Sequence, residues 1–217
     1  MSRRRRSTGS VALALVFVVG SVLAPVDAHH GSIEAYDFSY RPVTLKGLST
    51  NPTNPARDHP IRWTNTGNTD HRMMAQPQVI AFDSGHLDPG ETSSATRLKF
   101  AATYKYVCIF HGGMDGRIKV RPALYEPGAP GNYAVTIRLG EKAILRLANG
   151  ELPNNRVMDV QRKRGSGTWT TIRTGVIKQR IYVGAGKEGS YRFRTRVRTD
   201  AGARTSWSPA SKVLKLT

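Results

Sequence analysis

One short segment, residues 104–116, carries the only cysteine of the chain together with a histidine and a methionine. It reads Tyr-Lys-Tyr-Val-Cys-Ile-Phe-His-Gly-Gly-Met-Asp-Gly, so that Cys108 stands three residues before His111 and six before Met114. A thiolate, an imidazole and a weak thioether are three of the four groups of a blue-copper electron-transfer site. The spacing therefore predicts a metal loop, and a second histidine from elsewhere is needed to complete it.

We expect this fourth ligand to be His71. A strand-like run that begins at residue 61 ends in a cluster of polar turn residues, and His71 follows that cluster. A soft thiolate and two imidazoles suit both oxidation states of copper, and a long axial thioether helps to tune the reduction potential. A lone cysteine is most often a small buried hydrophobe, but the combination favours a copper site made of His71, Cys108, His111 and Met114.

Residues 31–121 resemble the cupredoxins, the small blue copper proteins that include plastocyanin and amicyanin. The resemblance rests on residues 36–42, 63–65, 71, 83–91 and 104–120. It implies a Greek-key β-sandwich in which the ligand loop joins the last two strands. It also implies that the copper ligands are His71, Cys108, His111 and Met114.

The chain departs from this family at two places. Arg72 follows the first ligand histidine, where cupredoxins commonly have Asn or Thr. Phe110, Gly112 and Gly113 stand in the loop where amicyanin-like proteins often have prolines. We therefore expect the bracing of the two ligand loops to differ from that of the family.

The N-terminal residues predict export. Four arginines at residues 3–6 precede an apolar run at residues 11–24, and Val26-Asp-Ala28 is a small-x-small cleavage signature. This pattern is typical of a secretory signal peptide covering residues 1–28, and the apolar run is short for a membrane span. We expect a mature secreted or extracytoplasmic protein, in the periplasm or cell envelope, that begins at His29. Oxidising compartments favour paired cysteines, so the unpaired Cys108 favours a metal-bound thiolate.

The second part of the chain is expected to be a separate, basic domain. Three prolines and two glycines in residues 122–131 predict a linker, and residues 132–217 follow it. Short runs rich in β-branched and aromatic residues predict strands at 134–138, 142–147, 156–161, 167–172, 179–183 and 190–198. The whole chain is thus predicted to be all-β, with a second β-sandwich after the first.

This second part resembles the later half of a fibronectin type III domain. The resemblance rests on Trp169, on residues 191–198 and on residues 201–210. It implies that Tyr191 is a tyrosine corner. Residues 143–147 lack the tryptophan that this family often carries in its second strand.

Positive charge is concentrated in the second part. The formal charge is +18 for the whole chain, and residues 122–217 hold 18 Lys and Arg against six Asp and Glu, a charge of +12. Alternation predicts one face of a strand that carries four arginines: Arg192, Arg194, Arg196 and Arg198. Such a stripe attracts anions, so the candidate partners are an anionic cell-wall polymer, a membrane surface or an acidic redox protein. Charges on an edge strand also prevent aggregation.

Three classes of function compete. The first is an electron carrier with one copper and an unknown redox partner, and the second is an extracytoplasmic copper-delivery protein tethered by its basic domain. An adhesion module with a vestigial copper loop is the third. We expect no enzyme, because six histidines are too few for a multicopper oxidase; a copper oxygenase that uses His29 as a histidine brace is a remote alternative. Without a recognisable nucleic-acid module, we expect no nucleic-acid partner.

Overall fold

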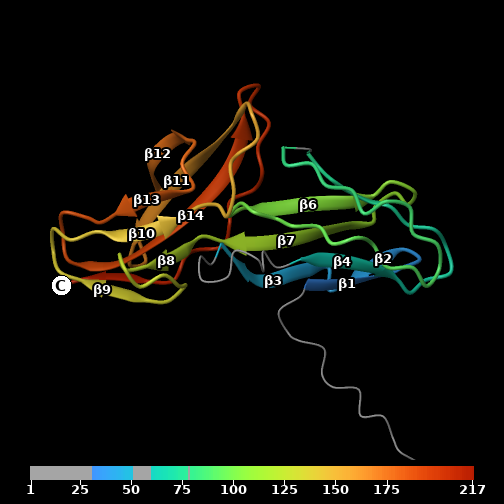
Figure 1. Cartoon of the computed structure of the whole chain (residues 1–217), viewed down its shortest axis with the longest axis horizontal. Helices are drawn as coiled ribbons and strands as arrows, with labels where there is room; N and C mark the ends of the chain where they lie inside the picture. The colour runs from blue at the N-terminus through green and yellow to red at the C-terminus, as the bar shows by residue number, and fades with distance from the viewer. Residues whose placement is uncertain (1–30, 51–59, 78) are drawn as a thin grey trace, which may run out of the picture.

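The computed structural model describes residues 31–50, 60–77 and 79–217 (Figure 1). Strands and turns but no helix occur in these ranges, which confirms the predicted all-β class. No helix capable of crossing a membrane is found there. The predicted signal peptide and the mature N-terminal His29 lie outside the described residues.

The first half contains two sheets, with strand orders β2-β1-β4 and β3-β7-β6-β5. Strand β1 runs parallel to β4 and β3 runs parallel to β7, and the other neighbours are antiparallel. The metal loop lies between β6 and β7, the last two strands of this half, as predicted. The strands are β1 (Gly31–Tyr36), β2 (Ser39–Arg41), β3 (Thr44–Ser49), β4 (Ile61–Asn65), β5 (Met73–Ala75), β6 (Thr103–Cys108) and β7 (Asp115–Arg121).

Strand β6 brings the cysteine into the protein interior. Successive side chains of a strand point to opposite faces, and on β6 Tyr104, Tyr106 and Cys108 share the buried face. Tyr106 packs edge-on against Trp63 of β4, with ring centroids 5.6 Å apart. The aromatic core therefore fixes the strand that ends at Cys108.

The second half contains two further sheets, ordered β13-β10-β8 and β12-β11-β14-β15-β9. All six strands predicted from the sequence are present, and their ends lie within four residues of the predicted ends. These strands, with the two that were not predicted, are β8 (Ala123–Tyr125), β9 (Val135–Ile137), β10 (Ala143–Arg146), β11 (Arg156–Arg164), β12 (Thr170–Val176), β13 (Arg180–Val183), β14 (Gly189–Thr199) and β15 (Leu214–Leu216).

Strand β8 lies inside the range expected to be a linker. Its three residues are buried and pair with β10. Alternating apolar character is difficult to recognise in so short a segment between prolines, which is why the sequence pattern missed it. The division of the chain into two domains at residues 122–131 stays a prediction.

The alternation predicted for β14 is present. Tyr191, Phe193, Thr195 and Val197 are buried, and the intervening arginines lie on the other face. The hydroxyl of Tyr191 donates a hydrogen bond to the carbonyl oxygen of Lys187 at 2.7 Å. This bond has the form expected of a tyrosine corner, while the fibronectin type III resemblance itself stays a prediction.

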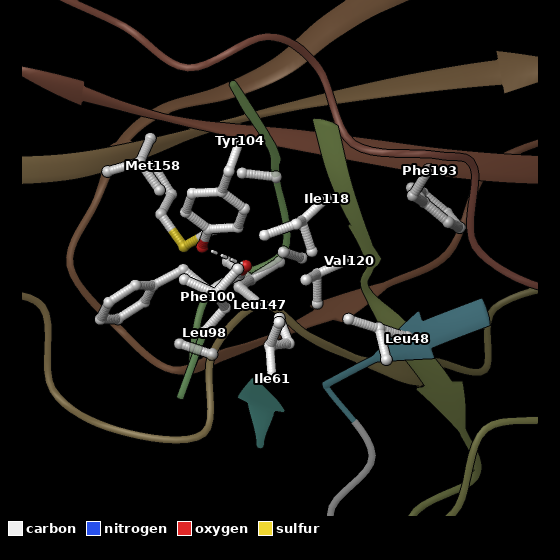
Figure 2. Packing of buried hydrophobic residues seen from close by; sticks show 14 of the residues in the cluster. Leu48, Ile61, Leu98, Phe100, Tyr104, Ile118, Val120, Leu147, Met158 and Phe193 are labelled. Atoms are coloured by element: carbon white, nitrogen blue, oxygen red, sulfur yellow. Dashed lines mark hydrogen bonds between the residues drawn. The ribbon is translucent and has the colours of Figure 1, made fainter. Parts of the chain in front are cut away.

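The two halves share a continuous hydrophobic core. One cluster of buried side chains runs from Ile118 and Val120 of β7 to Met158 of β11 and Phe193 of β14. Figure 2 shows Phe100 and Leu147 in the middle of this packing. The halves are therefore packed on each other and are not joined by the connecting segment alone.

Hydrogen bonds reinforce this junction. The N–H of Ala101 donates to the carbonyl of Leu147 at 2.8 Å, and the N–H of Asn149 donates to the carbonyl of Lys99 at 2.9 Å. The buried hydroxyl of Thr195 donates to the carbonyl of Ala101 at 2.5 Å. Residues 99–103 thus bind the second half much as an extra strand does.

Candidate metal centre

His71 is held at a fixed position by the backbone. Its N–H donates to the carbonyl of Leu87 at 3.0 Å, and the N–H of Leu87 donates back at 2.8 Å. The histidine is fully buried. Because both bonds involve the main chain, they fix the position of the His71 backbone, from which the imidazole extends.

Asn65 organises the turn that leads to His71. Its side-chain amide donates to the carbonyls of Thr69 (2.8 Å) and Leu87 (3.0 Å), and its oxygen accepts from the N–H of Gly67 (3.0 Å). All three bonds are internal, which satisfies a fully buried polar side chain. The polar cluster in the sequence indicated a turn here, but it did not identify Asn65 as the residue that holds the turn.

The loop after Cys108 closes on itself and on the His71 segment. The N–H of Cys108 donates to the carbonyl of Met114 at 3.0 Å, and the N–H of Ile109 donates to the carbonyl of Arg72 at 3.0 Å. Gly113 has a φ of 80°, in the left-handed region that favours glycine. Glycine is therefore used at the tight turn between His111 and Met114.

The three nitrogen and sulfur donors converge. The Cys108 Sγ lies 3.6 Å from the His71 Nδ1 and 3.5 Å from the His111 Nδ1. All three atoms lie within 4.8 Å of one another. A thiolate at about 2.3 Å and an imidazole nitrogen at about 2.1 Å from a tetrahedral metal would be about 3.6 Å apart. The spacing therefore fits a shared first-row transition metal.

Burial favours the metal-binding form of His71. Removal from water, together with the neighbouring His111, lowers the pKa of the His71 imidazole below its ordinary value. The sign follows from the charge, because both effects destabilise the protonated ring. The imidazole is thus kept neutral, and the neutral form is the one that binds metals.

Met114 lies next to this cluster and is buried, with 3% of its surface exposed. Its N–H donates weakly, at 3.4 Å, to the carbonyl of His111, and its carbonyl accepts from Cys108. The backbone therefore keeps Met114 beside the other three residues. Its role as the axial ligand stays a prediction.

Arg72, directly after His71, forms an ion pair that braces this segment. Its Nη2 donates to Asp83 at 2.6 Å and its Nε lies 3.1 Å from both carboxylate oxygens. The Arg72 guanidinium lowers the pKa of Asp83 below its usual range. The ion pair ties the His71 segment to residues 83–85, because Asp83 also accepts from the N–H of Gly85.

Exposed apolar side chains lie beside His111 in space or next to it in the sequence. Phe38, in the turn between β1 and β2, packs edge-on against the imidazole at 5.3 Å and is 74% exposed. Ile109 and Phe110 are 46% and 47% exposed. The sequence did not indicate the contact between Phe38 and His111, because no pattern in the chain places a residue of the first hairpin beside the last loop.

A second group of possible metal donors consists of Asp70, His86 and Asp88, all exposed. His86 lies 3.2 Å from Asp70 and 2.9 Å from Asp88. These contacts are surface ion pairs when the histidine is protonated. His86 also packs against Phe110, with ring centroids 5.4 Å apart.

No protein-family model and no curated protein matches the sequence. Among solved structures, the chain is similar to the oxidised state of a proline-to-alanine mutant of amicyanin, at 19% identity and a TM-score of 0.36. That match covers 45% of this chain and 87% of the amicyanin. It is also similar to the copper-containing nitrite reductase of Thermus scotoductus SA-01, at 15% identity and a TM-score of 0.26, over 87% of this chain and 61% of the reductase.

The residues of this site define its chemical class without these comparisons. One buried cysteine sulfur and two imidazole Nδ1 atoms converge, with a buried methionine beside them. Two imidazoles, one thiolate and a long axial thioether are the donor set of blue copper. The site therefore fits type 1 copper, and the chain has the features of a copper-binding protein.

Proposed function

We propose that this chain is an exported type 1 copper protein that binds one copper ion and transfers single electrons. The convergence of the Cys108 Sγ with the Nδ1 atoms of His71 and His111 is the observation that carries the proposal. Bound copper supplies one-electron chemistry between Cu(I) and Cu(II). Cys108 would be the dominant ligand, the two histidines the equatorial imidazoles and Met114 the weak axial donor.

The contribution of the protein is to hold these ligands still. The His71 segment is paired with Leu87, and the bond from Ile109 to Arg72 links the two ligand segments. Ligands fixed by their supporting bonds change position little when the charge of the site changes. This rigidity suits electron transfer better than it suits metal release.

Electrons would enter and leave through the exposed edge of His111. The rim made by Phe38, Ile109 and Phe110 is apolar and accessible. A small apolar surface suits the brief, weak encounters of redox proteins. Export is part of the proposal because residues 1–28 have the pattern of a signal peptide.

The visible absorption spectrum of the mature protein, residues 29–217, titrated with Cu(II) while the thiol is kept reduced, tests the proposal. We expect an intense thiolate-to-copper band that saturates at one copper per chain and a reversible midpoint potential. The matched control is Cys108→Ser, which removes the thiolate and nothing else from the donor set, and which should abolish the band.

Each result has a distinct meaning. An unchanged spectrum in Cys108→Ser would overturn the site. A coloured protein that has no reversible potential and passes Cu(I) readily to an acceptor would support copper delivery instead. A protein that shows only the faint absorption band of nitrogen and oxygen ligation would indicate that Cys108 does not bind Cu(II) and that His29 and the other histidines are the next candidates.

A further inference from the structure

Three adjoining hollows form a trough on the second half of the molecule. Residues of β10, β12 and β13 contribute to their linings, and their volumes are about 940, 480 and 470 Å³. The first two hollows share Lys142, Arg173 and Tyr182, and the last two share Arg162 and Ala185. Because neighbouring hollows share lining residues, they adjoin one another, and we call the three together the basic trough.

The lining of the basic trough is strongly positive. Eight lysine and arginine side chains line it, against two acidic ones, Glu141 and Glu151. None of these eight cations forms an ion pair with any residue that the structure describes. Their partners are neutral groups: Arg146 donates to the Asn149 side chain and Arg164 to the Glu188 carbonyl. The positive charge is thus uncompensated within the described protein.

Two of the cations face each other at an energetic cost. Arg146 and Arg180 are directly opposite each other in the antiparallel pairing of β10 with β13. Like charges at directly opposed positions destabilise a sheet. An anion that binds between them would remove this repulsion, so the pair has a physical reason to be present if the trough has an anionic occupant.

The trough also offers apolar contacts. Tyr182 is 59% exposed and lines both larger hollows, and Ile177 is 69% exposed. An exposed aromatic ring among arginines provides a flat surface for the C–H face of a sugar ring, while guanidinium groups bind carboxylates through paired hydrogen bonds. We propose that the basic trough binds a linear acidic polysaccharide, with sugar rings on Tyr182 and carboxylates on the row of cations.

The arginine stripe of β14 is less suited to this role. Arg196 and Arg198 each donate to the buried carboxylate of Asp159 at 3.0 Å. Arg194 lies over the rings of Trp169 and Trp207, at 4.5 and 5.0 Å from their centroids. Two of these four arginines are therefore neutralised by an internal carboxylate and a third is stacked on aromatic rings, whereas none of the eight trough cations forms an ion pair within the described residues.

Polygalacturonate is the probe that tests the inference, and fully methyl-esterified galacturonan is the control with the same backbone and no charge. Titration of the full mature chain should show binding of the first polymer, weakening with added salt, and none of the second. Binding does not require copper, so the outcome is independent of the electron-transfer proposal. Failure of polygalacturonate to bind at low salt would overturn the inference.

Matched variants locate the site. Arg173→Gln with Arg180→Gln removes one exposed charge from β12 and one from the strand β13 and should weaken binding at least roughly tenfold, because each substitution removes a charge-assisted contact to a carboxylate. Arg192→Gln with Arg204→Gln makes the same change in charge outside the trough and should have little effect. Equal weakening by both pairs would show non-specific attraction and overturn the trough as the site.

Two further measurements separate a polysaccharide from other anions. Tyr182→Ala should weaken polygalacturonate binding without changing net charge, and far-ultraviolet circular dichroism checks that this variant is folded. Binding of polyphosphate or of phosphatidylglycerol vesicles that exceeds polygalacturonate binding and is unchanged in Tyr182→Ala would overturn the choice of a carbohydrate.

Discussion

At the scale of single residues, the metal site combines two kinds of control. Cys108, His71 and His111 provide donors whose positions are set by backbone bonds. Arg72 and Asp83 act from outside, because their ion pair holds the His71 segment in place. The chemistry of the site therefore depends on a few donors, and its geometry depends on neighbours that need not touch the metal.

Met114→Leu tests the axial position. We expect the copper-loaded variant to keep its intense colour, because the thiolate and imidazoles remain, but to show a raised reduction potential. By donating electron density, a thioether stabilises Cu(II) more than Cu(I), and leucine has no such donor. Visible spectroscopy and voltammetry measure the two effects. Identical potentials in the variant and the parent protein would contradict axial ligation.

Asp83→Asn tests the ion pair through its pH dependence. The pKa of Asp83 is lowered in the folded protein, so its contribution to stability is complete above the unfolded value of about 3.9 and is lost as pH falls through the lower folded value. The side chains of Arg72 and Asp83 are 41% and 35% exposed. We therefore expect Asp83→Asn to lower the free energy of unfolding by only about 1 kcal/mol or less at pH 7.

Urea unfolding at pH 7 and pH 2.5 measures this effect. The difference between Asp83→Asn and the parent protein should be present at pH 7 and smaller at pH 2.5, because the pKa of Asp83 is lowered in the folded protein. Arg72→Gln is the matched control, and combining it with Asp83→Asn should add little at pH 7. Additive losses would mean that the two residues act separately.

At the scale of elements, β11 and β14 are joined by ion pairs as well as by the hydrogen bonds of their antiparallel pairing. Asp159 of β11 is 2% exposed and pairs with Arg196 and Arg198 of β14. It also accepts from the N–H of Gly175 in β12 at 3.4 Å. One carboxylate therefore links three neighbouring strands of the five-stranded sheet.

Asp159→Ala should destabilise the protein by about 3 kcal/mol, because it leaves two arginines without their buried partner. Equilibrium unfolding in urea measures the loss. Asp200→Ala removes the same type of side chain from an exposed site just after β14 and should change stability by less than about 0.5 kcal/mol. Equal effects of the two substitutions would show that the Asp159 pairs add nothing.

At the scale of the whole molecule, the two halves behave as one packed body. The shared cluster around Phe100 and Leu147 (Figure 2) and the bonds of residues 99–103 cross the junction. Because burial of apolar surface is the main favourable term in folding, neither half keeps its full core when the other unfolds. We therefore expect the halves to unfold together.

Calorimetry of the copper-free mature protein should show a single transition. Phe100→Ala should lower the free energy of unfolding by about 3–5 kcal/mol and should keep one transition, since the residue lies at the shared core. Phe38→Ala removes the same type of side chain from an exposed position and should cost far less. Two separate transitions, of which only one moves in Phe100→Ala, would contradict joint unfolding.

The sequence alone was enough to predict the metal loop and the two faces of β14. The Cys-x-x-His-x-x-Met spacing predicted that Cys108 and His111 lie together, because a loop of six residues leaves few ways to arrange its donors. The alternation along residues 190–198 predicted both faces of β14, because a strand has a period of two. These features depend on local geometry, which adjacent residues specify.

Tertiary structure alone decided the features that join distant segments. Phe38 beside His111, Arg72 bound to Asp83, the opposed pair Arg146 and Arg180, and the shared core around Phe100 all bring together residues from different strands. The four arginines of β14 looked equivalent in the sequence, yet Asp159 pairs with only two of them. Such contacts depend on sheet order and register, which follow from the packing of the whole chain and have no local signature.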